Sequence, residues 1–155
     1  MITSVSEVQK VLEICKTVRE ELQAEQIPYA EKIELGIMIE TPAAAIISDQ
    51  LAPLVDFFSV GTNDLTQYTL ACDRQNPDIE SFCDTHHEAI LRLIAWSAKN
   101  AHEHGAWIGI CGELAADTSL TERFLRMGID ELSVSPTFVL KVRDAVRKID
   151  LRTEE

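Results

Sequence analysis

Apolar residues along this chain follow two alternating patterns. Short apolar runs at residues 33–39, 55–60, 107–110 and 131–134 have the length and composition of buried β-strands. Each run is followed by a stretch of helical character, which is rich in small residues after the first run and long and amphipathic from about Glu88 to His104. One further stretch of this helical kind, up to about Glu25, precedes the first run. The pattern predicts one helix followed by four β-α units.

Local capping signals support several of the helices. Ser4-Val5-Ser6-Glu7 has the form of a capping box and predicts the start of the first helix. Thr41-Pro42 predicts an N-cap with proline at the first position of a helix that continues through Leu51. Gly105 follows a long amphipathic stretch from about Glu88 to His104 and predicts its end.

Alternation of strands and helices predicts an α/β fold with a parallel sheet and helices packed outside it. Four strands leave two open sheet edges, and no strand carries the lysine or proline that usually protects such an edge. A complete (β/α)₈ barrel needs about 250 residues. We therefore expect half of such a TIM barrel, with about four parallel strands and flanking helices.

The composition of the chain limits which classes of molecule it is expected to bind. The chain has 155 residues, enough for one domain, and a formal net charge of −12. That charge argues against nucleic acids and anionic membranes as partners, although a few cations in one cleft can still bind a small anion. We find no apolar run of about 18 residues and no apolar centre of a signal peptide. We therefore expect no membrane insertion and a cytoplasmic protein.

The four cysteines, at positions 15, 72, 83 and 111, lie at wide and irregular spacing. No CxxC pair occurs, so the spacing indicates neither a zinc site nor a disulfide framework. We therefore interpret each cysteine separately, as a buried thiol or a reactive one.

Polar residues follow the predicted strands, at the edge where α/β proteins usually place their chemistry. Glu40 and Asp64 follow neighbouring strands, so their carboxylates could bind one Mg²⁺, or each could simply favour the start of a helix. Asn63 offers a hydrogen-bonding amide. Cys111 is either a packing thiol or a proton donor, and Arg74 either a surface ion-pair residue or an anion clamp. Ser135 follows the fourth strand.

Three segments in the same order resemble a known family. Residues 36–43 (GIMIETPA), 56–68 (DFFSVGTNDLTQY) and 111–115 (CGELA) look like the phosphoenolpyruvate-binding barrel of Enzyme I, the phosphoenolpyruvate–protein phosphotransferase of the bacterial sugar phosphotransferase system. The resemblance covers nearly the whole chain. It implies that residues 1–155 are the second, C-terminal half of the barrel, and that the first half and the phosphohistidine domain are absent.

The resemblance also implies residue roles and a reaction. By this resemblance Glu40 and Asp64 bind Mg²⁺, Asn63, Asp64 and Arg74 bind phosphoenolpyruvate, and Cys111 gives a proton to the enolate to form pyruvate. The family transfers the phosphoryl group to its own histidine and then to a histidine phosphocarrier protein, and it forms homodimers. None of the four histidines here lies in a phosphohistidine motif. We therefore expect this fragment to be inactive alone.

Three other interpretations remain open. Phosphoenolpyruvate synthase and pyruvate phosphate dikinase have barrels with similar motifs. A Mg²⁺-dependent lyase acting on pyruvate enolates would also need two carboxylates on one cation. A non-enzymatic role as a scaffold would use the open sheet edges for self-association.

Overall fold

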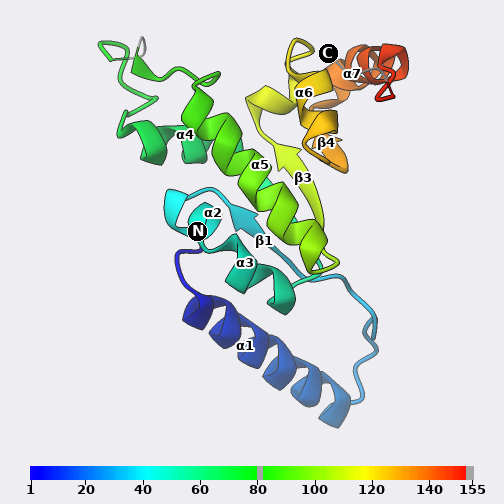
Figure 1. The fold of residues 1–155 in the computed structure, drawn as a ribbon. Helices are drawn as coiled ribbons and strands as arrows, with labels where there is room; N and C mark the ends of the chain where they lie inside the picture. The colour runs from blue at the N-terminus through cyan, green and yellow to red at the C-terminus, as the bar shows by residue number, and fades with distance from the viewer. Residues whose placement is uncertain (80–81, 153–155) are drawn as a thin grey trace.

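One parallel sheet of four strands forms the centre of the protein in the computed structural model, which describes residues 1–79 and 82–152 (Figure 1). The strands follow one another across the sheet in chain order, β1-β2-β3-β4. They comprise β1 (Gly36–Ile39), β2 (Phe57–Gly61), β3 (Trp107–Cys111) and β4 (Glu131–Ser133). This confirms the predicted α/β class, with four parallel strands and flanking helices.

One helix precedes the first strand and helices follow each of the four strands, as the pattern predicted. They comprise α1 (Val5–Ala24), α2 (Pro42–Ile46), α3 (Ser48–Leu51), η1 (Ala52–Leu54), α4 (Thr62–Leu70), α5 (Glu88–Glu103), η3 (Glu113–Ala116), α6 (Thr121–Arg126), η4 (Pro136–Phe138) and α7 (Val139–Lys148). Within the described ranges, none has the length and apolar character needed to cross a membrane.

Both predicted N-terminal capping signals are present. The Ser4 backbone N–H donates to the Glu7 carboxylate at 2.9 Å, and the Ala44 N–H donates to the Thr41 hydroxyl at 3.1 Å. The helix predicted from Pro42 through Leu51 is wrong in one respect, because it is interrupted at Ile47. The Ser48 hydroxyl donates back to the Ala45 carbonyl at 2.8 Å, an alternative to regular helical bonding.

The main core lies between the sheet and the helices. Ile39, Phe58, Val60, Ile108 and Ile110 are fully buried. On β2 the buried side chains alternate with half-buried ones, whereas Gly109 between the two isoleucines of β3 is also buried. Figure 1 shows α5 crossing the sheet on this face. The same core contains the apolar side of α5, namely Ile90, Leu91, Ile94, Ala98 and Ala101.

The opposite face of the sheet is less buried. Phe57, Ser59, Trp107 and Cys111 alternate with the core residues and are half-buried. Phe57 and Trp107 are register partners on β2 and β3, and their rings stack with centroids 4.4 Å apart. In a complete barrel this face would point to the interior, where side chains from all the strands fill the space.

Two aspartates secure the amino ends of the strands. Asp56 precedes β2 and accepts the Leu35 backbone N–H at 2.7 Å. Asp130 precedes β4 and accepts the Ile108 backbone N–H at 2.9 Å. These carboxylates hold neighbouring chain segments together, at the end of the sheet that contributes to stability in barrel proteins.

The unequal burial of the two faces can be tested with adjacent phenylalanines. Replacing fully buried Phe58 with alanine should lower the free energy of unfolding by about 3–5 kcal/mol, because it leaves a cavity in the core. Phe57→Ala, the matched control, should cost only about 1 kcal/mol, since half-buried Phe57 loses mainly its stacking on Trp107. Urea denaturation measures both. Equal losses would contradict the one-sided core.

Candidate functional site

The carboxyl ends of the strands bring the predicted residues to one rim of the sheet. Parallel pairing places Gly61 of β2 beside Cys111 of β3, and Cys111 beside Ser133 of β4. Helix α4 begins at Thr62, immediately after β2, so Asn63 and Asp64 lie in its first turn. The register therefore confirms the prediction that residues far apart in the sequence meet at this edge.

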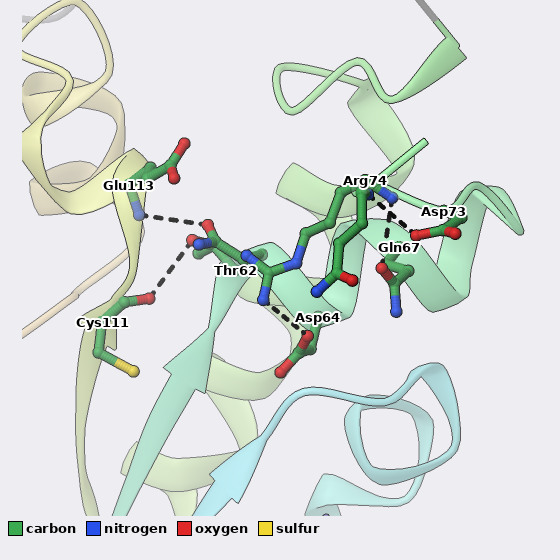
Figure 2. Close-up of polar contacts among 9 residues, drawn as sticks. Thr62, Asp64, Gln67, Asp73, Arg74, Cys111 and Glu113 are labelled. Atoms are coloured by element: carbon green, nitrogen blue, oxygen red, sulfur yellow. Dashed lines mark hydrogen bonds and ion pairs between the residues drawn. The ribbon is translucent and has the colours of Figure 1, made fainter. Parts of the chain in front are cut away.

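Asn63 is held in a defined orientation by the neighbouring strand end. Its side-chain oxygen accepts the Glu113 backbone N–H at 3.3 Å. The Thr62 hydroxyl donates to the Cys111 carbonyl at 3.3 Å (Figure 2), which joins the same two segments a second time. Because the oxygen of the Asn63 amide is engaged, its NH₂ group is the part available to donate to a ligand.

Gly112 allows these two segments to approach. Its φ of 108° lies in the left-handed region, which favours glycine. A Cβ at this position would lie 2.6 Å from the Thr62 hydroxyl oxygen and 3.2 Å from the Asn63 side-chain oxygen. Any larger residue would therefore displace the Thr62 hydroxyl and crowd the Asn63 amide beside it.

Arg74 reaches back from the loop after α4 toward the start of that helix (Figure 2). Its guanidinium Nη2 lies 3.5 Å from Asp64 Oδ1, and its backbone N–H donates to Gln67 Oε1 at 3.4 Å. Both charged side chains remain partly exposed. Arg74 thus forms a partly exposed ion pair, which is one of the two roles that the sequence left open, and its role as an anion clamp stays a prediction.

Two adjoining cavities share Asn63 and Glu113 in their walls. The first, of about 390 Å³, is also lined by Arg74. The second, of about 410 Å³, is also lined by Cys111 and Ser135. Asn63 therefore stands between the predicted anion clamp and the predicted proton donor.

Cys111 lies half-buried at the end of β3 with two hydrogen-bond partners. Its Sγ accepts from the Ser59 hydroxyl at 3.4 Å and donates to the Val60 carbonyl at 3.4 Å. The sequence analysis did not single out Ser59. A polar residue inside the apolar run at 55–60 was the available signal that it has a partner on the neighbouring strand. Ser59 acts as a positioning residue for the sulfur.

Thr66 is a second residue that sequence reasoning missed. It lines the first cavity and is 3% exposed. Within the described part of the chain, its hydroxyl oxygen has no hydrogen-bond partner. A buried polar atom without a partner costs free energy, so this hydroxyl favours a polar ligand or water in the cavity.

Glu40 and Asp64 share the rim but have separate partners. The Glu40 carboxylate packs over Gly61, where a Cβ would come within 2.9 Å of Oε2. Its Oε1 lies 3.7 Å from the terminal ammonium of Met1, whereas Asp64 pairs with Arg74. Neither carboxylate lines the two cavities described above. The described residues contain no cluster of three or more histidine, cysteine or acidic ligands for a metal.

The expectation that each cysteine acts separately is wrong for Cys72 and Cys83. They form a disulfide, with their Cα atoms 5.9 Å apart, while Cys15 and Cys111 are free. The loop between α4 and α5 turns back on itself, so residues 11 positions apart become neighbours. Spacing alone does not reveal such a turn.

His86 anchors the end of this loop against η3. Its Nε2 lies 2.7 Å from Asp117 Oδ2. The Ser119 hydroxyl, followed by the Ser119 backbone N–H and by His86, lowers the pKa of Asp117 below its usual value. The adjacent His87 accepts the Ala89 N–H at 3.1 Å and caps α5. Both histidines therefore shape the loop around the first cavity.

Known proteins match this chain over most or all of its length. Residues 1–151 match the family described as "PEP-utilising enzyme, PEP-binding domain". A "Phosphoenolpyruvate-protein phosphotransferase" of Lactococcus lactis subsp. cremoris is 44% identical over 155 residues, which is 100% of this chain and 27% of the relative. Proteins with the same name from Priestia megaterium and from Buchnera aphidicola subsp. Schizaphis graminum (strain Sg) are 43% and 45% identical, each over 96% of this chain and 26% of the relative. The chain thus spans about a quarter of the length of these relatives, and it belongs to the family of PEP-binding domains of PEP-utilising enzymes.

Proposed function

We propose that this chain binds phosphoenolpyruvate and Mg²⁺ as part of a phosphoenolpyruvate–protein phosphotransferase. In the proposed reaction, the phosphoryl group passes to a histidine of the whole enzyme and then to a histidine phosphocarrier protein. The observation that carries the proposal is the position of Asn63. Its fixed amide stands between the cavity with Arg74 and the cavity with Cys111.

The names of the relatives support phosphotransfer over the alternatives. The three relatives quoted above all have the name phosphoenolpyruvate-protein phosphotransferase. This favours Enzyme I over a dikinase, a phosphoenolpyruvate synthase or a pyruvate-enolate lyase. Homodimer formation and a cytoplasmic location remain expectations from the family resemblance.

Each residue of the site has a role that its contacts suit. Arg74 and Asn63 would bind the anionic oxygens of the substrate, and the Arg74 guanidinium would offset the negative charge that shifts as the phosphoryl group leaves. Cleavage of the P–O bond leaves the enolate of pyruvate, which must gain a proton at its methylene carbon. The Cys111 thiol would give that proton and become a thiolate, to which the Ser59 hydroxyl already donates. Solvent then restores the thiol.

The donor set at the rim suits Mg²⁺. Proteins commonly hold this ion with one or two carboxylates, while substrate oxygens and water fill the other positions. Glu40 and Asp64 would supply the two carboxylates, from the ends of neighbouring strands. When bound, Mg²⁺ would offset negative charge on the substrate. A cluster of three protein ligands is therefore not required.

The metal assignment is tested by titrating the chain with phosphoenolpyruvate in the presence and absence of Mg²⁺. Asp64→Ala and Glu40→Ala should each weaken the Mg²⁺-dependent binding by about tenfold or more, since each removes a charged ligand. Asp49→Ala is the matched control, because Asp49 is an exposed acid in the first turn of α3, away from the rim. Isothermal calorimetry measures the affinities. Unchanged binding in both rim variants would refute the metal assignment.

The position of Cys111 predicts protection by the substrate. Phosphoenolpyruvate with Mg²⁺ should slow alkylation of Cys111 by iodoacetamide in proportion to occupancy, because the thiol lines the proposed site. Cys15, a free cysteine on α1, serves as the internal control and should react at the same rate throughout. Peptide mass spectrometry follows both residues. Equal rates at Cys111 with and without bound substrate would place the ligand elsewhere.

The missing acceptor predicts that the chain alone is not phosphorylated. Incubation with phosphoenolpyruvate and Mg²⁺ should leave no stable protein-bound phosphate, because no histidine of the chain lies in a phosphohistidine motif. Radiolabelled substrate and gel electrophoresis provide the measurement, with an intact phosphotransferase as the positive control. Stable labelling of a histidine in this chain would contradict the proposal that the phosphorylated histidine belongs to another part of the enzyme.

A further inference from the structure

The Cys72–Cys83 disulfide borders the proposed substrate site. Both cysteines line the same cavity as Asn63 and Arg74. Cys72 lies just after α4, and Arg74 follows it by two residues. The bond thus closes the loop that carries Arg74, and it connects that loop to the segment before α5.

Non-covalent contacts hold Arg74 only weakly. Its hydrogen bond to Gln67 and its ion pair with Asp64 are long, at 3.4 and 3.5 Å, and the ion pair is partly exposed. Exposed ion pairs of this kind contribute little to stability. The disulfide is therefore the strongest described constraint on the path of the loop around Arg74.

The two sulfurs differ in access. Cys72 is 4% exposed, whereas Cys83 is half-buried. A small thiol can therefore reach the Cys83 sulfur more easily. In the cytosol, where we expect this protein, disulfides are rare, and those that occur are usually catalytic or redox-sensing. The access to Cys83 and the expected cytoplasmic location both favour a bond that opens and closes over a permanent cross-link.

We infer that Cys72 and Cys83 form a reversible thiol–disulfide site that controls how firmly Arg74 is held at the anion-binding cavity. The inference rests on the proposed function for the ligand, and on the expected cytoplasmic location for the reversibility of the bond. In the opening step, a low-molecular-weight thiolate attacks the Cys83 sulfur and Cys72 leaves as a thiolate, which takes up a proton. A second small thiol then displaces Cys83, and the two small molecules leave as their disulfide. Closure is the reverse exchange with that small disulfide.

The position of the loop can be measured without any ligand. Trypsin cleaves after Arg74 only when this segment fits into the protease. The chain is treated with oxidised or reduced glutathione, and the state of each cysteine is mapped by alkylation and mass spectrometry. We expect cleavage after Arg74 to be about tenfold faster once the bond is open, because local opening governs proteolysis. Equal cleavage rates, or four alkylated cysteines in excess oxidised glutathione, would overturn the inference.

Two variants serve as controls. Cys83→Ser should be cut at the fast rate under both conditions, because the bond cannot form and the half-buried position accepts a hydroxyl. Cys15→Ser should behave like the unmodified chain, since Cys15 is free and lies on α1. A redox response that persists in Cys83→Ser would assign it to another cysteine and overturn the inference.

A second titration connects the bond to substrate binding. With Mg²⁺ present, opening the bond should weaken phosphoenolpyruvate binding by about threefold to tenfold, because Arg74 must then be ordered when the ligand binds. By linkage, phosphoenolpyruvate should favour the closed form to the same extent. Equal affinity in the two forms would contradict control of the site by the bond. Absence of binding in both forms would contradict the proposed function instead, and the trypsin comparison would still decide whether the bond positions the loop.

Discussion

The site depends on the register of the parallel sheet. Pairing of Gly61 with Cys111, and of Cys111 with Ser133, ends three strands at one level. The residues that come immediately after these strand ends then lie at the same rim of the sheet. A shift of one residue would turn Ser59 and Cys111 toward the helices and bring core residues to the reactive face, because strand side chains alternate between faces. Register therefore sets both the core and the chemistry.

Residues of one chemical type have different roles at the two ends of this sheet. Asp56 and Asp130, at the amino ends, accept backbone N–H groups and hold the strands together. Asp64 and Glu40, at the carboxyl ends, form ion pairs with Arg74 and with the ammonium of Met1. The first pair has hydrogen bonds to the backbone of neighbouring segments, whereas the ion pairs of the second pair are long, at 3.5 and 3.7 Å.

The conformation of the loop between α4 and α5 could not be predicted from local sequence patterns. Its sequence has neither helical nor strand periodicity, so nothing local predicts that Cys72 and Cys83 approach to 5.9 Å. The interruption at Ile47 has a similar cause, since Ser48 also accepts a hydrogen bond from Asn100 of α5, at 2.8 Å. In both cases a contact between distant segments decided the local conformation.

The sequence by itself determined the alternation of strands and helices, the helix caps, and the position of Glu40, Asn63, Asp64 and Cys111 at the carboxyl ends of strands. These features follow from apolar periodicity and capping chemistry, which act over a few residues. Only the tertiary structure decided that Glu113 orients the Asn63 amide, that Ser59 contacts Cys111, and that a disulfide closes the loop of Arg74. Those contacts join residues separated by 11 to 52 positions, so they exist only once the chain has folded.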